Sequence, residues 1–152
     1  MAAPVYPWRE DNQFELMVDG DCFFPRLLQA MRQARQSIDI ELYLVESGHS
    51  TERVTEILTD AVARGVRVRC LFDGAGSRSL QETDRERLRQ AGVELRFYNP
   101  LNLLGGRANL HRDHRKLILV DEHTAFIGGA GFTDEFCIPD EAGQCLWHEQ
   151  ML

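Results

Sequence analysis

The chain has 152 residues, 43% of them apolar, and a formal net charge of −7, which together indicate one globular domain with its own hydrophobic core. The acidic balance argues against a non-specific nucleic-acid binder, and no apolar run is long enough to cross a membrane. No secretory signal opens the sequence and no C-x-x-C pair occurs among its four cysteines, which favours the reducing cytoplasm as its compartment.

Apolar strands alternate with amphipathic helices through residue 97 of the sequence. The strict alternation of residues 37–45 indicates a central strand whose second face is partly polar. This order of elements predicts a layered α/β domain in which right-handed crossovers join parallel strands. The predicted strands are residues 14–18, 37–45, 66–72 and 93–97.

Three helices are predicted between these strands from their capping signals. The first carries Pro25 in its opening turn. The second begins with Ser50 as its N-cap and ends near Gly65. The third opens with a capping box from Ser79 to Glu82. A loop at residues 73–76 follows a strand and has two interpretations, the border of a ligand site or a turn that simply needs glycine.

The most informative stretch begins at His114 and has the pattern H-x-K-x4-D, ending at Asp121. Residues 116–120 and 124–127 are short apolar runs that predict a β-hairpin. Because residues two apart share one face of a strand, His114 and Lys116 project side by side, roughly 6 to 7 Å apart along the chain. An imidazole beside an ammonium suits an anion, since the lysine supplies positive charge and the histidine a nucleophile or proton carrier.

The surroundings of this pair leave its role open. A histidine next to basic residues is commonly only a surface feature, although the glycine pair at residues 128–129 permits close backbone approach to a ligand. Metal binding by His111, His114 and His123 is a competing interpretation, but no carboxylate at the usual spacing completes a ligand set. A locally positive patch is predicted from four cations against Asp113: Arg107, Arg112, Arg115 and Lys116.

Residues 114–121, followed by residues 125–129, resemble the H-x-K motif of the phospholipase D superfamily. Further segments resemble the cardiolipin synthase-like branch of that superfamily: residues 14–20, 37–45, 71–77 and 147–149. The resemblance implies a phospholipase D-like layered α/β fold over residues 1–152, with a mixed, mostly parallel sheet flanked by helices. It also implies phosphatidyl transfer through a phosphohistidine, from a phosphatidylglycerol-like phospholipid, without a metal or another cofactor.

The resemblance also assigns roles within the motif. His114 is implied as the nucleophile or the acid, Lys116 as the clamp on the phosphate, and Asp121 as a structural and electrostatic anchor. A carboxylate on a later strand orients the histidine in this family, and Glu149 is the candidate here. The alternative is that Glu149 is an ordinary charged residue with no part in orienting the histidine.

Two glycines are candidate substrate-binding residues through their backbone N–H groups, namely Gly129 and Gly131. Gly131 stands where the family commonly has an asparagine or serine, so a side-chain donor is missing there.

The sequence contains one H-x-K motif, whereas enzymes of this family bring two such motifs to one active site. Three interpretations follow: the N-terminal half of a two-motif phosphatidyltransferase, a single-motif phosphodiesterase or nuclease that pairs with its own copy, or a non-catalytic anion-binding or interaction module. The expected partners are therefore a phospholipid and either a second phospholipase D-like half or a homodimer partner.

The loop at residues 99–104 carries three leucines near the basic stretch. This combination predicts contact with an anionic lipid surface, and so a cytoplasmic protein peripheral to the membrane. Packing of the loop against another half of the enzyme is the alternative.

Overall fold

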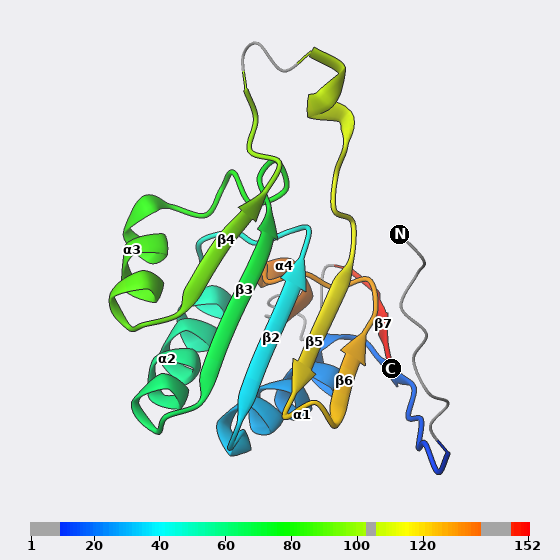
Figure 1. Ribbon diagram of the computed structural model, residues 1–152. Coiled ribbons are helices and arrows are strands. Elements are labelled where there is room, and N and C mark those ends of the chain that lie inside the picture. The colour runs from blue at the N-terminus through cyan, green and yellow to red at the C-terminus, as the bar shows by residue number, and fades with distance from the viewer. Residues whose placement is uncertain (1–9, 103–105, 138–146) are drawn as a thin grey trace.

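The computed structural model describes residues 10–102, 106–137 and 147–152. Its centre is a five-stranded sheet with the strand order β4-β3-β2-β5-β6 (Figure 1). The β2–β3 and β3–β4 pairs are parallel, whereas β2–β5 and β5–β6 are antiparallel. Of these five strands, β5 therefore runs against the others, which is the mixed, mostly parallel arrangement that was expected. The strands are β2 (Ser37–Leu42), β3 (Arg67–Asp73), β4 (Glu94–Tyr98), β5 (Lys116–Val120) and β6 (Thr124–Ile127).

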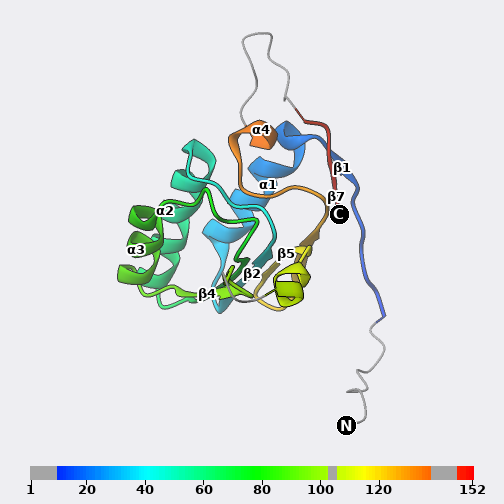
Figure 2. The ribbon, with the colours of Figure 1, turned by 90° about the horizontal axis from the view of Figure 1, so that it is seen from above.

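Helices α1 (Gly20–Gln33), α2 (His49–Ala63) and α3 (Glu82–Gln90) lie on one side of this sheet, as the view from above shows (Figure 2). The core fills the space between these helices and the sheet because the helices turn their apolar stripes toward the inward side chains of the strands. Among the described residues, no helix is long and apolar enough to cross a membrane. The most deeply buried core side chains include Phe23, Leu27, Met31, Ile38, Leu42, Leu58, Phe72 and Ile118.

Two short strands extend this architecture beside β6. Strand β1 (Met17–Val18) pairs antiparallel with β7 (Gln150–Met151). Ile127 and Leu152 exchange backbone hydrogen bonds of 3.0 and 2.9 Å, and Gly128 forms a bridge with Met151. Strand β7 thus lies along the end of β6, which brings residues 147–149 next to the segment that follows β6.

The first predicted strand and the first predicted helix differ from the structure. Pairing in the predicted strand at residues 14–18 is confined to Met17 and Val18, opposite the two residues of β7. Helix α1 begins at Gly20, with Asp19 as its N-cap, so Pro25 lies inside the helix rather than in its first turn. The helix tolerates this proline at the cost of one backbone hydrogen bond.

The capping signals of the other two helices were also wrong, because side chains distant in the sequence replace the local caps. Ser50 is buried within α2, and Asp134 of the short helix α4 (Asp134–Cys137) accepts hydrogen bonds from the N–H groups of His49 and Ser50, at 3.1 and 2.7 Å. Helix α3 begins at Glu82 without a capping box, and the N–H group of Gln81 donates instead to Oγ of Ser47 at 2.8 Å.

The loop between β4 and β5 projects beyond the sheet and contains the 3₁₀ helix η1 (Gly106–Leu110) (Figure 1). The side-chain amide of Asn99 ties the loop together by donating to the carbonyls of Ala108 and His111, at 2.6 and 2.8 Å. Of the three leucines expected to face a lipid surface, Leu101 is exposed, and residues 103–104 lie outside the described part of the chain. Leu110 at the end of η1 is also exposed, at 78%.

Candidate active site

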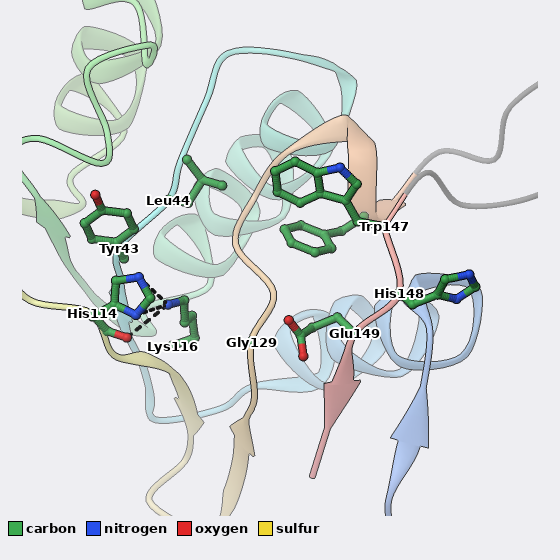
Figure 3. Close-up of a pocket in the computed structure, with 9 residues that line it drawn as sticks. Tyr43, Leu44, His114, Lys116, Gly129, Trp147, His148 and Glu149 are labelled. Atoms are coloured by element: carbon green, nitrogen blue, oxygen red, sulfur yellow. Dashed lines mark hydrogen bonds between the residues drawn. The ribbon is translucent and has the colours of Figure 1, made fainter.

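The H-x-K segment stands at the carboxyl ends of β2 and β3, because β5 runs antiparallel to β2 and starts where β2 ends. Lys116 pairs with Leu42 in the ladder, and the N–H group of Tyr43 donates to the carbonyl of Arg115 at 3.1 Å. His114 and Lys116 project side by side, as the period of the strand predicted (Figure 3). The ammonium of Lys116 lies 2.7 Å from Nδ1 of His114 and donates to the His114 carbonyl at 3.0 Å.

Tyr43, the residue that follows β2, supports this pair. Its ring centroid is 4.5 Å from that of the His114 imidazole, with the planes inclined by 39°. The Lys116 ammonium lies 5.5 Å from the centre of the same ring, within the range of a cation–π contact. The tyrosine ring therefore contacts both functional side chains and restricts the orientation of the exposed imidazole.

A cavity of about 490 Å³ opens in front of the pair (Figure 3). Its second wall comes from the segment before β7, where Trp147 packs edge-on against Phe136 with centroids 5.1 Å apart. Sequence reasoning singled out only some of the residues around this cavity. The described residues that line it are Tyr43, Leu44, His114, Lys116, Gly129, Phe136, Trp147, His148 and Glu149.

Glu149 and Gly129 fit together across this cavity. A Cβ atom at position 129 would overlap the carboxyl group of Glu149, so a larger residue there would displace that carboxyl group from its present position. Glu149 accepts a hydrogen bond from the N–H group of Gln150 at 3.0 Å, and no hydrogen bond joins it to His114 among the described residues. The structure thus brings Glu149 to the same cavity as His114 but leaves its expected contact with the imidazole unmade.

The surroundings of Lys116 shift its pKa. Partial burial lowers the pKa of Lys116 below its usual value, while the carboxylates of Glu149 and Asp113 act in the opposite direction. A less firmly held proton makes this ammonium a stronger hydrogen-bond donor toward an anion.

Asp121 lies at the far end of β5 from Lys116 and does not line the cavity. Its carboxylate accepts hydrogen bonds from the backbone N–H groups of residues 35–37, the shortest being 2.7 Å from Gln36. Burial acts to raise the pKa of Asp121, but these N–H donors outweigh it and hold the pKa below its usual value. The geometry is that of an anchor for the hairpin, with no contact to the reacting groups.

Gly131 is buried and is not among the residues around the cavity. A Cβ atom there would overlap the carbonyl of Leu44, so the backbone has no room for the asparagine or serine expected from the family. The N–H group of the next residue, Phe132, donates to that carbonyl at 3.0 Å. Close packing of two backbone segments therefore explains the glycine.

The predicted positive patch is weaker than its charge count, because acidic partners distant in the sequence neutralise two of its four cations. The guanidinium of Arg112, 17% exposed, pairs with the fully buried carboxylate of Asp73 at 3.3 Å. Arg115 pairs with Glu41 at 2.8 Å. Among the described residues at this cavity, Lys116 supplies the permanent positive charge. In the described part of the chain, no group of three or more His, Cys, Asp or Glu side chains is arranged to hold a metal ion, and His123 lies in the hairpin turn.

Asp73 gives the loop at residues 73–76 a definite role. Its carboxylate accepts hydrogen bonds from the N–H groups of Ala75, Gly76 and Asp113, at 2.8, 3.0 and 2.9 Å. Burial acts to raise the pKa of Asp73, but these donors and the charge of Arg112 together lower it. Through Asp113 the loop fixes the segment that leads directly into His114.

Sequence reasoning left the loop that begins at Asp73 with two interpretations. It gave no individual role to five described residues that line the cavity: Tyr43, Leu44, Phe136, Trp147 and His148. Tyr43 and Asp73 stand at or just past the carboxyl ends of neighbouring strands, where α/β sheets place their binding groups, and this position was the available signal. Trp147 lies in residues 147–149, which carried part of the family resemblance, but its place at the cavity depends on the β6–β7 contact.

Comparisons with known proteins show the family of the chain. Residues 27–140 match the family described as "Cardiolipin synthase, PLD-like domain". Cardiolipin synthase B of Salmonella typhi is 38% identical over 130 residues, which cover 84% of this chain and 32% of that protein. Cardiolipin synthase of Oceanobacillus iheyensis is 32% identical over 129 residues, covering 85% and 27% of the two chains. The chain thus spans about a third of the length of these relatives.

Solved structures share the fold at low sequence identity. The phospholipase D family member Nuc from Salmonella typhimurium superposes with a TM-score of 0.64 at 21% identity, over 90% of this chain and 78% of that one. Phosphatidylserine synthase of Haemophilus influenzae gives a TM-score of 0.65 at 17% identity, over 90% and 33%. With a phospholipase D-like fold and a family match over residues 27–140, the chain belongs to the cardiolipin synthase-like branch of the phospholipase D superfamily.

Proposed function

We propose that this chain is one phospholipase D-like domain that supplies half of the active site of a phosphatidyltransferase. The observation that carries the proposal is the His114–Lys116 pair, whose imidazole nitrogen and ammonium lie 2.7 Å apart at the mouth of a cavity of about 490 Å³. A nucleophile beside a fixed positive charge is what displacement at a phosphodiester requires. The cardiolipin synthases among the relatives support a phospholipid as the substrate.

In the first half-reaction, an imidazole nitrogen of His114 attacks the phosphorus of the donor lipid. A bond from phosphorus to nitrogen forms as the bond from phosphorus to the head-group oxygen breaks, and the leaving alcohol takes a proton from a second histidine. Lys116 holds the non-bridging oxygens and stabilises the charge that develops on them. The result is a phosphohistidine that carries the phosphatidyl group.

In the second half-reaction, the hydroxyl of an acceptor alcohol attacks the phosphohistidine. Its proton passes to the second histidine, the bond between phosphorus and nitrogen breaks, and the electron pair returns to the imidazole of His114. A further phospholipase D-like half or a second copy of the chain would bring that second histidine. A homodimeric phosphodiesterase or nuclease would instead hydrolyse its substrate, and product analysis distinguishes the two activities.

Phosphate binding is expected to redirect Lys116. An ammonium that donates to Nδ1 leaves the imidazole proton on Nε2, whereas attack by Nε2 requires that proton on Nδ1. When Lys116 turns to the phosphate oxygens, Nδ1 becomes available to donate to a carboxylate. Glu149 is the carboxylate among the described residues that line the cavity, so we assign it the orienting role. A role of Gly131 in binding substrate stays a prediction.

Contact with a lipid surface follows from the same proposal. The exposed Leu101 and Leu110 lie on the projecting loop that leads into the H-x-K segment. Such side chains can enter the interfacial layer of a membrane while the active site stays close to the head groups.

The test is the substitution His114→Ala in the complete enzyme, meaning this chain together with whatever supplies its second histidine. We expect phosphatidyl transfer between vesicle lipids to fall at least roughly a thousandfold, with His123→Ala in the hairpin turn as the matched control. Acid quenching of the wild type with phosphorus-labelled donor should trap label on His114, and a chelator should leave the rate unchanged. Full transfer by the His114→Ala variant would exclude the assignment.

A further inference from the structure

A second cavity, of about 460 Å³, adjoins the one that holds His114 and shares Tyr43 and Leu44 with it. Its size lies within the range of roughly 300–1,000 Å³ typical of small-molecule sites. The loop after β3, which Asp73 organises, forms one side, and the segment after β2 forms the other. Its described lining residues are Tyr43, Leu44, Glu46, Ala75, Gly76, Arg78 and Ser79.

The polar side chains of this second cavity are one cation, one carboxylate and one hydroxyl, from Arg78, Glu46 and Ser79. Among the described residues, Arg78 forms no ion pair, in contrast to the neighbouring Arg85 and Arg112, which pair with Glu82 and Asp73. Glu46 likewise forms no ion pair with a described residue, although it lines the same cavity as Arg78. Three functional groups with free hydrogen-bonding capacity thus face one small space.

The backbone around this second cavity is held firmly. The N–H group of Glu46 donates to the carbonyl of Phe132 at 3.0 Å, and the carbonyl of Glu46 accepts from the hydroxyl of Thr51 at 2.5 Å. The carbonyl of Ser79 accepts from the N–H group of Ser47 at 3.2 Å. Gly76 packs so closely on Tyr43 that a Cβ atom would overlap the tyrosine carbonyl. The backbone that carries these polar groups is therefore fixed, so that only their side chains need to be ordered when a ligand binds.

We propose that this second cavity binds the acceptor of the transfer reaction through a phosphorylated polyol, an inference that rests on the proposed function. Arg78 would bind the phosphate, since a guanidinium forms paired charge-assisted hydrogen bonds with phosphate oxygens. Glu46 and Ser79 would bind the neighbouring hydroxyls, one as an acceptor and the other as donor or acceptor.

The position of the cavity supports this assignment. The donor phosphodiester occupies the cavity of His114 and Lys116, and the two cavities meet at Tyr43 and Leu44. A polyol held in the second cavity can therefore extend a hydroxyl past Tyr43 toward the phosphohistidine. Specific binding of an acceptor alcohol there favours transfer over hydrolysis, because the bound hydroxyl reaches a high effective concentration relative to water.

The experiment measures the donor and acceptor steps separately in the complete enzyme. The burst of head-group release on mixing with donor vesicles reports formation of the phosphohistidine, and the concentration dependence of transfer gives the acceptor KM. Two acceptors distinguish the sources of the ligand: glycerol phosphate in solution and phosphatidylglycerol in vesicles. The variants are Arg78→Ala, Arg78→Lys and Glu46→Gln, and Arg53→Ala, an exposed arginine of α2, is the matched control.

For Arg78→Ala we expect the acceptor KM to rise about tenfold, with the burst rate unchanged, and the share of hydrolysis product to increase. Arg78→Lys should recover part of the affinity because it keeps the charge without the paired geometry. A higher KM for both glycerol phosphate and phosphatidylglycerol would identify a lipid head group as the ligand. A higher KM for glycerol phosphate alone would identify a free polyol phosphate.

An unchanged acceptor KM in Arg78→Ala would overturn the inference, and so would a parallel loss of burst rate, which would place Arg78 in the donor site. Both of these results are measured on Arg78→Ala and are independent of the outcome for His114→Ala. Transfer that survives that substitution would instead contradict the proposed function.

Discussion

At the scale of single residues, the clearest relation in the site is between Gly129 and Glu149. The carboxyl group of Glu149 occupies the space that a side chain at position 129 would fill. We expect Gly129→Ala to lower kcat about tenfold by displacing that carboxylate from the cavity, with little change in the fold.

A double-mutant cycle checks this explanation. If the methyl group acts only by displacing the carboxylate, Gly129→Ala should add nothing to the loss already caused by Glu149→Ala. Additive losses in kcat would contradict it and give Gly129 a separate role.

Tyr43 supplies a second prediction at this scale. Tyr43→Ala removes the ring that contacts both the His114 imidazole and the Lys116 ammonium, so kcat should fall about tenfold. Tyr43→Phe keeps both contacts and should retain most of the activity. Equal losses in the two variants would mean that the hydroxyl group, rather than the ring, is the important feature.

Only the local part of the site could be predicted from the sequence. The side-by-side placement of His114 and Lys116 follows from the period of a strand and needs no tertiary information. The pairing of Arg112 with Asp73 joins residues 39 apart in the sequence, and the charge count of a local segment does not contain it. For the same reason the local count overestimated the positive charge of the predicted patch, although every charge within the segment was counted correctly.

At the scale of elements, Asp121 fixes the active-site hairpin to the start of β2. Because backbone donors hold its pKa below the usual value, the carboxylate stabilises the fold above about pH 4, and this contribution disappears as the pH falls through the lowered pKa. We expect Asp121→Asn to reduce the free energy of unfolding by about 1–2 kcal/mol at neutral pH.

Denaturant unfolding at several pH values measures this contribution. The difference between wild type and Asp121→Asn should shrink toward zero in acid, since both side chains are then uncharged. The neighbouring exposed Glu122→Gln is the control and should leave the pH dependence unchanged. If the difference in unfolding free energy persists at low pH, the effect comes from hydrogen-bond geometry rather than from charge.

The elements themselves were largely predictable, whereas their ends were not. The hairpin of β5 and β6 and the alternation of strands with helices follow from apolar periodicity, which is a local property. The N-terminus of α2 depends on Asp134, which lies 84 residues from Ser50 in the sequence. Side chains brought in by the tertiary fold therefore replaced the local caps that Ser50 and Ser79 offered.

At the scale of the whole molecule, the cavities carry positively charged side chains although the protein as a whole is negatively charged. The net charge of −7 repels anions in general, and among the described residues that line the two cavities the basic side chains with a permanent charge are Lys116 and Arg78. Recognition of an anionic lipid would therefore depend on short-range contacts rather than on long-range attraction. Transfer rates in vesicles should accordingly change little with ionic strength once the enzyme is bound.

The pairing of β2 with β5 also has a consequence for how the protein folds. Asp121 reaches Ser37 across 84 positions of sequence, so the strand that carries Lys116 joins the sheet only after a long loop has closed. The parallel β2–β3 unit with α2 involves shorter separations and should be ordered earlier. In refolding kinetics, we expect Ile118→Val to accelerate unfolding with little effect on the folding rate, whereas Leu58→Ala should slow folding. The β5–β6 hairpin would then be the last part of the sheet to form, and the nascent chain would hold most of its scaffold before the candidate nucleophile His114 is in place.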